Sequence, residues 1–536
     1  MTASIEAATR HHRAGRIDDA IGACRAILAA EPGHAGALNL LGIVSVEMGD
    51  LDASLRFFRR AVRLDPREGV HWFNLGTARS VGGDVAGAVG ALRRAIGTAP
   101  NGAPAHAQLG EALLGLGRVA EAAGAFRRAL RLDPTAAGGR DGVARCQRYQ
   151  GAMAAAPLAT AALTTAALTT VERGLVIRGA FVNSSGYGYA CRRFVQALRA
   201  RGVPLQAIGV RGPESWPAED LDRPVPARAM VNFLIPSAVE RVPGLAAVTF
   251  TVFEGTRIPP AWRRQSDLSD LIVVPCESAR IAWAAAGFPE DRLRVCPQGV
   301  DPDQSAGGAP LTLIDPQGRP VSSYRHRVLN ISDFIPRKNI DGLLRVWLRS
   351  TTRADDAVLI LKLGKGGSPA LRADLATLVR RSESAVGRRL AEAAPVVLVE
   401  QTLTDAGMTA LVRTATHYWS MSHGEGWDLP MVRAGALGLG LIAPRHSAYV
   451  DYLDDRVARL IPATVGPARL PGSDLFYPPF HGLDWWNPDE DAAAAILAGI
   501  LRGDGLPSAR AHLLQNFSWS RAAGRLLAIL DEAGLR

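Results

Sequence analysis

Lysine and cysteine are both scarce in this 536-residue sequence, and the pattern of the few cysteines excludes two classes of site. The five cysteines are odd in number and far apart, and none belongs to a CxxC pair: Cys24, Cys146, Cys191, Cys276 and Cys296. A disulfide-stapled domain and a cysteine-based zinc site are therefore excluded, and a reduced, cytoplasmic chain is expected. Only three of the 61 basic residues are lysines, so a lysine at the end of a strand stands out against an arginine background.

Long apolar segments are also missing. The N-terminus lacks the apolar core of a signal peptide. The uncharged run 151–171 has the length of a membrane span, but it is mostly alanine and threonine and too weakly apolar to insert. The formal net charge is +10, yet the arginines are spread along the chain, so no nucleic-acid partner is expected. Peripheral contact with a membrane surface stays open.

The first 134 residues contain a repeat with a period of 34 residues. Prolines, glycines and small residues all recur at that spacing: Pro32, Pro66, Pro100 and Pro134; Gly15, Gly49, Gly83 and Gly117; Ala20, Ser54, Ala88 and Ala122. The pattern resembles the tetratricopeptide repeat, a helix pair with glycine in the turn, small residues where the helices cross, and proline after the second helix. We therefore expect an α-solenoid over residues 1–150, closed by a polar capping helix from Thr135 to Gln150.

The concave face of such an array is its expected binding surface. Asn39, Asn74 and Gln108 lie on or near it, where amides suit the backbone of an extended peptide, although the three do not keep one register. Arrays of this class bind proteins, so a protein partner is expected. The Ala/Thr-rich stretch 151–172 is interpreted as a linker, and the array is expected to have a hydrophobic core of its own.

Beyond Arg173, short apolar runs alternate with helical stretches. Runs such as GLVIRGAFV, LIVVP, HRVLNIS and AVLILKL are typical of buried parallel strands. The alternation predicts two α/β domains, 173–322 and 323–536, in a double-Rossmann arrangement with a cleft between them. In the first domain, the turn containing Gly186 and Gly188 would let the backbone approach a ligand at a helix N-terminus, although it is not a complete GxGxxG motif.

Two strand ends in the second domain carry the scarce lysines. Arg337 and Lys338 follow the strand that ends at Ser332, and Lys362 lies at the end of the next strand. Adjacent cations at a strand–helix junction suit a diphosphate, with arginine as a planar fork and lysine as a compact charge. A solvated start of a helix is the alternative.

A third motif, HGEGWDLPMVRAGALG, places Glu425 between Gly424 and Gly426 ahead of a helix that begins near Pro430. The free N–H groups of that helix after Pro430, such as that of Met431, are expected to form an anion site, at which Leu429 and Pro430 also lie. A lone acid in a turn is commonly only a helix cap. An acid between two glycines before a proline-initiated helix is stronger evidence of a site.

These blocks together resemble a family-4 glycosyltransferase of the GT-B fold. The matching blocks are TVFEGTRIPPAW, LIVVPCESAR, DFIPRKNIDGLLRVW, SHGEGWDLPMVRAGALGLGLIAP and NFSWSRAAGRLLAIL. The fold class implied is α plus α/β: a tetratricopeptide-repeat solenoid followed by a GT-B enzyme, with an acceptor-side domain at 173–322, a nucleotide-sugar-side domain at 323–536 and a C-terminal return helix. Retaining transfer from a nucleotide sugar is also implied, with no tightly bound cofactor and no metal.

The resemblance implies roles for particular residues. Lys338 with Arg337 would hold the donor diphosphate, and Glu425 would contact hydroxyls of the donor sugar, with Gly424 and Gly426 letting the backbone close on that sugar. These carboxylate and cation roles are expectations carried over by position in the motifs.

Three positions depart from the family or stay open. Arg433 replaces the second acid of the family's E-x7-E motif, which usually holds the ribose, so altered nucleotide recognition is expected. Ser332 stands where the family commonly has a second cation of the diphosphate site, and Arg337 is expected to compensate. Glu254 stands where an acceptor-side catalytic contact is expected, with a structural cap as an equal alternative.

The leading hypothesis is a glycosyltransferase whose array recruits an acceptor protein. One alternative is a polysaccharide or lipid-linked glycan transferase that its array docks onto a glycan-assembly protein. Another is a catalytically inactive GT-B scaffold that senses a sugar or nucleotide, which Arg433 favours and the intact Arg337, Lys338 and Glu425 oppose.

Overall fold

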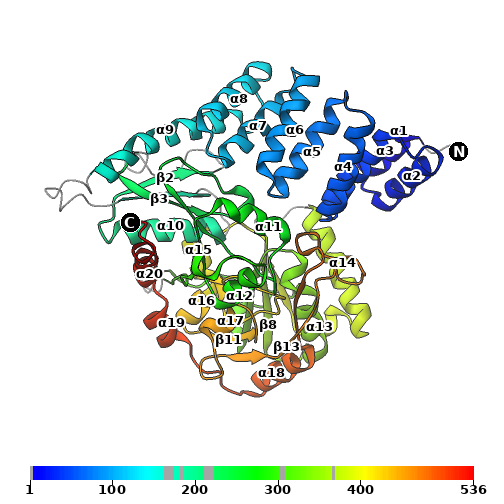
Figure 1. Ribbon diagram of the computed structural model, residues 1–536. Helices are drawn as coiled ribbons and strands as arrows, with labels where there is room; N and C mark the ends of the chain where they lie inside the picture. The colour runs from blue at the N-terminus through cyan, green and yellow to red at the C-terminus, as the bar shows by residue number, and fades with distance from the viewer. Residues whose placement is uncertain (1–3, 162–173, 182–185, 211–222, 301–307, 365–368) are drawn as a thin grey trace.

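The computed structural model describes residues 4–161, 174–181, 186–210, 223–300, 308–364 and 369–536. A helical array forms the N-terminal quarter of the chain, and two domains built on parallel sheets follow it (Figure 1). The predicted turn residues 183–185 lie outside the described residues, as does the stretch 162–172 of the predicted linker.

Four helix pairs form the array. They are α1 (Ile5–Arg13) with α2 (Ile17–Ala30), α3 (Ala35–Glu47) with α4 (Leu51–Leu64), α5 (Gly69–Val81) with α6 (Val85–Thr98), and α7 (Ala103–Gly115) with α8 (Val119–Leu132). The glycine of each turn has a left-handed backbone, with φ between 71° and 82°, which a side chain would strain. The predicted repeats are therefore confirmed. Asn39 and Asn74 are hydrogen-bonded to each other at 3.0 Å.

The helix that follows the array, α9 (Gly139–Ala161), belongs to the array and to the first sheet at once. Its buried Cys146 and Tyr149 join a single apolar cluster that includes Phe126 of α8 and Val176 and Met230 of the sheet. The expected polar capping helix thus connects the array to the first sheet through buried side chains, and the predicted linker boundary at residue 151 falls inside it. The last repeats of the array share a core with the first sheet, because their helices and the sheet bury each other's apolar side chains, whereas the first helices form apolar clusters of their own.

A buried ion network reinforces this junction. Glu240 accepts hydrogen bonds from Arg145 and Tyr149 of α9, and lies 2.7 Å from the Nη2 of Arg178 in the sheet. Glu240 is 4% exposed, so its charge depends on these partners for compensation. The array and the first sheet are therefore joined by polar as well as apolar contacts.

Turns of the array also contact the α/β domains, along whose upper side the array lies in Figure 1. The Nε of Arg264 donates to the carbonyl of Gly82 at 2.6 Å, beside the turn at Gly83. The turn at Gly49 packs against Pro478, which belongs to the second α/β domain. One array thus touches both α/β domains, and it is a docked element instead of a free arm.

The first sheet has six parallel strands in the order β2-β1-β3-β4-β5-β6. Its strands are β1 (Gly174–Gly179), β2 (Leu205–Gly209), β3 (Ala227–Phe233), β4 (Ala246–Phe250), β5 (Leu271–Val274) and β6 (Leu293–Val295). Its helices include α10 (Gly186–Arg199), α11 (Pro260–Gln265) and α12 (Glu277–Ala285). The C-terminal helix α20 (Trp519–Glu532) returns to this domain and packs on α10, where Phe194 meets Trp519 at 5.3 Å between ring centroids.

The second sheet is also six-stranded and parallel, in the order β12-β11-β10-β7-β8-β9. Its strands are β7 (His326–Ser332), β8 (Ala357–Leu363), β9 (Val396–Val399), β10 (His417–Trp419), β11 (Gly440–Pro444) and β12 (Arg459–Ile461). Its helices are α13 (Ile340–Ser350), α14 (Pro369–Val386), α15 (Asp405–Thr414), α16 (Leu429–Ala436), α17 (Tyr449–Tyr452), α18 (Glu490–Arg502) and α19 (Arg510–Asn516). An antiparallel pair, β13 (Ala463–Pro467) and β14 (Asp484–Pro488), flanks it.

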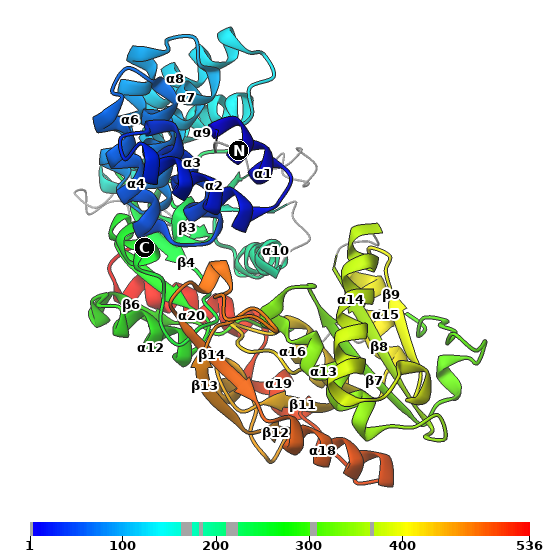
Figure 2. The same ribbon diagram turned by 90° about the vertical axis from the view of Figure 1, so that its right-hand side faces the viewer.

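The two domains are Rossmann-like, with nearly all strands buried and helices against the sheets. In Figure 2 the array lies above the first sheet, and the second sheet lies to the lower right of the first. The helix returning from the second domain to the first completes the GT-B arrangement that the sequence predicts. The five cysteines are buried and unpaired, as expected.

Candidate active site

The interdomain cleft lies at the carboxyl ends of the strands of both sheets. Its volume is about 680 Å³. The first domain lines it from the loops after β1, β4 and β6, with Phe181, Val252, Glu254 and Gln298. The second domain lines it from the ends of β7 and β8 and from the loops after β8, β9 and β10, with Ile331, Ser332, Lys362, Gly364, Thr402 and Glu425. Ligands of open α/β sheets bind at this edge. The fold therefore brings the sequence motifs of separate strands into one cavity.

The turn after β7 presents two cations to the cleft. Arg337 and Lys338 form a short 3-10 turn that ends at Asn339, whose φ of 50° is left-handed. The Asn339 side chain accepts from the N–H of Gly342 and donates to the carbonyl of Met421, both at 3.0 Å. This asparagine caps α13 and ties the turn to the loop after β10. The two neighbouring side chains are held against Glu425 as a result.

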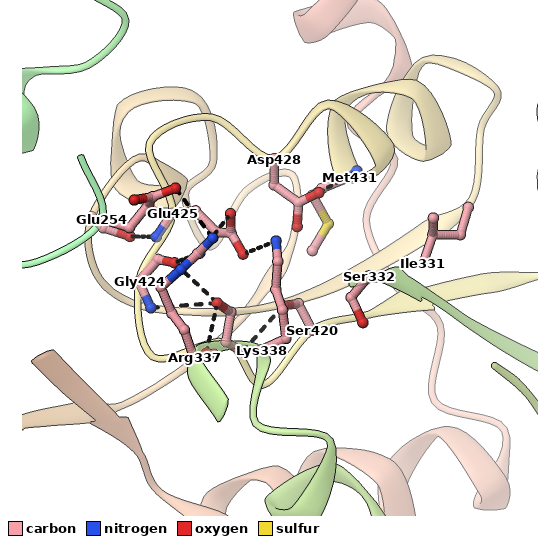
Figure 3. A network of polar contacts seen from close by, with 12 residues as sticks. Glu254, Ile331, Ser332, Arg337, Lys338, Ser420, Gly424, Glu425, Asp428 and Met431 are labelled. Carbon is pink, nitrogen blue, oxygen red and sulfur yellow. Dashed lines mark hydrogen bonds and ion pairs between the residues drawn. The ribbon is translucent and has the colours of Figure 1, made fainter. Parts of the chain in front are cut away.

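Glu425 is the centre of the charge network in Figure 3. The Nζ of Lys338 lies 2.6 Å from its Oε1, and the Nη1 of Arg337 lies 3.3 Å from its Oε2. Burial alone would raise the pKa of Glu425, but the charges of Lys338 and Arg337 outweigh burial and lower that pKa to about 2. The acid is therefore ionised at neutral pH, and it neutralises part of the cation pair.

Arg337 also bridges the two domains. Its Nη2 lies 3.1 Å from Glu254 of the first domain, and its Nη1 donates to the carbonyl of Gly424. The pKa of Arg337 is raised despite burial, because Glu254 and Glu425 stabilise the charged form. Two carboxylates thus compensate the two adjacent cations. Arg337 is engaged between protein groups here, whereas the sequence assigned it to a diphosphate.

The two glycines around Glu425 are required by domain contact. A Cβ at Gly424 would lie 1.8 Å from the backbone oxygen of Glu254, and one at Gly426 would lie 2.6 Å from the Cβ of Val252. Only glycine permits this approach. Gly426 lines the cleft, whereas Gly424 does not.

The backbone of Glu425 is held by a loop that the sequence did not single out. Its N–H donates to the Oγ of Ser447 at 3.0 Å, and its carbonyl accepts from the N–H of Ala448 at 3.2 Å. Ser447 has a left-handed φ of 46°, and its hydroxyl also contacts His446 at 2.9 Å. A serine held in this backbone region signals a positioning role that only the tertiary structure discloses.

The N-terminus of α16 is not the open anion site that the sequence predicts. The Oδ1 of Asp428 caps the N–H of Met431 at 3.1 Å, the N–H of Leu429 donates to the carbonyl of Trp427, and Pro430 has no N–H. The carboxylate of Asp428 therefore occupies the place that an anion would take. Leu429 and Pro430 line the cleft, whereas Met431 lies outside it.

Asp428 itself is a cleft residue that the sequence did not identify. It is buried, and the hydroxyl of Tyr449 donates to its Oδ2 at 2.8 Å. Burial, with Glu425 as the next cause, raises the pKa of Asp428 to about 6. The pKa values of Glu425 and Asp428 thus shift in opposite directions, because Lys338 contacts Glu425 directly and does not contact Asp428.

The remaining predicted residues lie as follows. The Nζ of Lys362 donates to the carbonyl of Gly364 at 2.6 Å at the edge of the cleft, and burial lowers the pKa of that lysine. Arg433 lines the cleft with its guanidinium carbon 5.1 Å from the ring centroid of Tyr189. Gly186 lines the cleft at the start of α10, whereas Gly188 does not.

The loop leading to α15 supplies a further wall that the sequence analysis missed. Leu403 and Met408 line it with Thr404, whose hydroxyl caps the N–H of Gly407 at 3.1 Å. The Thr404-Asp405 pair after a strand is a helix-start signal that could have located this wall. Within the described residues, no group of three or more His, Cys, Asp or Glu side chains is placed to hold a metal ion. None of their helices is long and apolar enough to cross a membrane.

Comparisons with known proteins find similar proteins for both the helical array and the α/β domains. Residues 5–69 and 73–137 match the family model of the tetratricopeptide repeat, so the array is a tetratricopeptide-repeat array. No curated protein matches the chain. The whole chain is similar to the O-GlcNAc transferase of Thermobaculum terrenum, with 16% identity, a TM-score of 0.39, and coverage of 99% of this chain and 96% of that one.

Two further solved structures are similar to the α/β part. Sucrose-phosphate synthase from Thermosynechococcus elongatus has 13% identity and a TM-score of 0.47, covering 67% of this chain and 100% of that one. HepE of Anabaena in complex with UDP and glucose has 11% identity and a TM-score of 0.45, with the same coverage. At these values the similarities assign no activity, and the GT-B description rests on the two sheets and the returning helix.

Proposed function

We propose that this protein is a retaining glycosyltransferase that moves a sugar from a nucleotide-sugar donor to an acceptor recruited by its tetratricopeptide repeats. The observation that carries the proposal is the cleft of about 680 Å³ at the carboxyl ends of both sheets, where Glu425 is held between two cations. The resemblance of the motifs to family-4 glycosyltransferases supplies retention and independence of a metal.

The reaction needs charge stabilisation more than covalent help. As the bond between the sugar and the diphosphate breaks, positive charge grows on the sugar and negative charge on the leaving group. Glu425 is ionised and placed to stabilise the positive charge on the sugar, and Lys362 at the edge of the cleft supplies positive charge for the leaving group. The close approach of the two domains at Gly424 would exclude water, which competes as an acceptor.

The array is proposed to bring the acceptor, which is an acceptor protein in the leading form of this function. Its docking onto both domains fixes its concave face relative to the cleft. Recruitment would then raise the local concentration of the acceptor without a new contact at the reacting atoms. An acceptor carried by a glycan-assembly protein is the alternative within the same reaction class.

A binding screen with a turnover assay tests this function. The purified chain would be melted with UDP, GDP and ADP and their glucose and N-acetylglucosamine derivatives, because a ligand of the folded state raises Tm. Slow release of free sugar from the stabilising donor, lost in Glu425→Gln, supports a transferase. Binding without any sugar release would instead favour an inactive sensing scaffold, for which the neutralised Arg337 is the structural argument. No stabilisation by any donor would refute the proposal.

A further inference from the structure

The cations that the sequence assigns to the donor diphosphate already have carboxylate partners. Lys338 lies 2.6 Å from Glu425, and Arg337 lies 3.1 Å from Glu254 and 3.3 Å from Glu425. Two positive and two negative charges cancel in this group. A diphosphate placed against it would meet two acids as well as two cations, so another source of positive charge is needed nearby.

The helix that follows this network does not supply that charge. The N–H groups at the start of α16 are satisfied, and the carboxylate of Asp428 occupies the capping position. Lys362 lies near Asp333, whose charge opposes the effect of burial on its pKa, and it already donates to the carbonyl of Gly364. The start of α16 therefore supplies no positive charge, and Lys362 supplies one only at the edge of the cleft.

Arg433 gives the cleft a further positive charge. It lies on α16 and lines the same cleft, half-buried. Among the described residues no carboxylate lies within ion-pair distance of Arg433, and its guanidinium carbon lies 5.1 Å from the centroid of the Tyr189 ring. A half-buried guanidinium over an aromatic ring keeps its planar fork available for two parallel hydrogen bonds to a phosphate.

We propose that Arg433 binds the diphosphate of the nucleotide donor, taking over in this chain the charge that Arg337 and Lys338 spend on Glu254 and Glu425. This inference rests on the proposed function and specifies its donor site. The position is the one where the resembling family has a second acid for the ribose. A cation there reverses the sign of the contact, so the residue would hold phosphate oxygens instead of sugar hydroxyls.

The tyrosine beneath Arg433 gives the site its geometry. Tyr189 belongs to α10 of the first domain, and Arg433 to α16 of the second. Gly186, at the start of α10, lies beside Leu429 of α16 in the same cleft, so the two helices meet here. An anion bound by Arg433 would therefore lie where the domains face each other, at the mouth shared by donor and acceptor.

Calorimetry on the full-length chain tests the assignment with UDP, GDP and ADP in turn, and with inorganic pyrophosphate as the base-free probe. Arg433→Gln should weaken the binding of the preferred diphosphate by roughly 10- to 100-fold, the worth of a charge-assisted hydrogen bond. Arg433→Lys should recover part of that loss. Arg433→Glu should weaken binding further, and Arg521→Gln, an exposed arginine of α20, is the matched control.

The outcomes of this experiment distinguish a failure of the Arg433 assignment from a failure of the proposed glycosyltransferase function. Unchanged affinity in a folded Arg433→Gln protein, with Tm within a few degrees of wild type, would overturn the inference. Tighter binding by Arg433→Glu would also overturn it, since the position would then serve the ribose. Pyrophosphate binding that depends on Arg433, with no nucleoside diphosphate bound, would uphold the anion site and refute the nucleotide-sugar function.

Discussion

The Nζ of Lys338 lies 2.6 Å from the Oε1 of Glu425, and this buried pair joins the two motifs that the sequence placed on different strands. The pair forms because the turn after β7 and the loop after β10 meet at the edge of one sheet. Neither residue is available as an isolated charge. Each of the predictions below depends on such a long-range contact.

Glu425→Gln should reduce sugar release or transfer by about 10²-fold or more, because it removes a charge aimed at the reacting sugar. Nucleoside-diphosphate affinity should not fall, since the change frees Lys338 and Arg337 from their shared partner. Calorimetry and a turnover assay on the same preparation measure both. A parallel loss of affinity and activity would show that Glu425 has another role.

The same substitution should cost stability, because buried cations lose compensation. A decrease of about 3 kcal/mol in the free energy of unfolding is expected from breaking a buried pair. Glu290→Gln is the matched control, since Glu290 pairs with Arg280 on the surface at 2.7 Å and should change stability by less than about 1 kcal/mol. Equal effects at the two sites would contradict the buried network.

Asp428 should make stability depend on pH between about 4 and 6. Its pKa of about 6 lies above the ordinary 3.8, so the folded chain holds this proton more tightly than the unfolded chain. The stabilisation is therefore complete below pH 4 and is lost as pH rises through 6, by about 3 kcal/mol at most. Glu425 acts oppositely, since its lowered pKa of about 2 stabilises the fold above pH 4.5 and that contribution is lost on acidification.

Asp428→Asn isolates the first of these effects. In chemical denaturation at pH 4, 5, 6 and 7, this variant should lose less stability than wild type as the pH rises from 4 to 6. Asp455→Asn, an exposed carboxyl beside Arg445, is the control and should leave the profile unchanged. A wild-type profile that rises between pH 4 and 6 in step with the variant would remove Asp428 as the titrating group.

Truncation of the array should depend on whether α9 is kept. Deleting residues 1–150 removes the first half of α9 and uncovers Val176, Ile208 and Met230, which are fully buried on the sheet. That protein should be insoluble, because a contiguous apolar face would be exposed. Deleting residues 1–134 keeps α9 in place and should give a folded protein with a lower Tm. Equal solubility and equal Tm of the two truncations would contradict a shared core.

Gly49 tests the contact between the array and the second domain. Gly49→Ala should strain a backbone with φ of 78° and place a methyl group 2.3 Å from the carbonyl oxygen of Pro478. Gly15→Ala is the matched control, because Gly15 has a φ of 71° at the same repeat position with nothing within 4 Å. Tm should fall further for Gly49→Ala, and amide exchange should rise at residues 468–483. Identical behaviour of the two variants would place the contact outside the native fold.

The sequence alone determines the elements of this protein. The 34-residue spacing specifies the helix pairs, since each repeat places glycine where the turn needs a left-handed backbone and small residues where the helices cross. Short apolar runs between helical stretches specify parallel strands, because strands buried on both faces need no alternation. Parallel strands in turn place Lys338, Lys362 and Glu425 at one sheet edge, so their common cleft was predictable.

The tertiary structure decides how those elements share partners. The pairing of Arg337 with Glu254 and the hydrogen bond from the backbone N–H of Glu425 to Ser447 each join groups that lie in different motifs or loops. The sequence predicts a polar cap and a linker where helix α9 lies, because the pattern of α9 does not specify which of its faces contacts the sheet. Local patterns fix backbone conformation and burial, whereas charge compensation and domain contact depend on which distant residues the fold brings within a few ångströms.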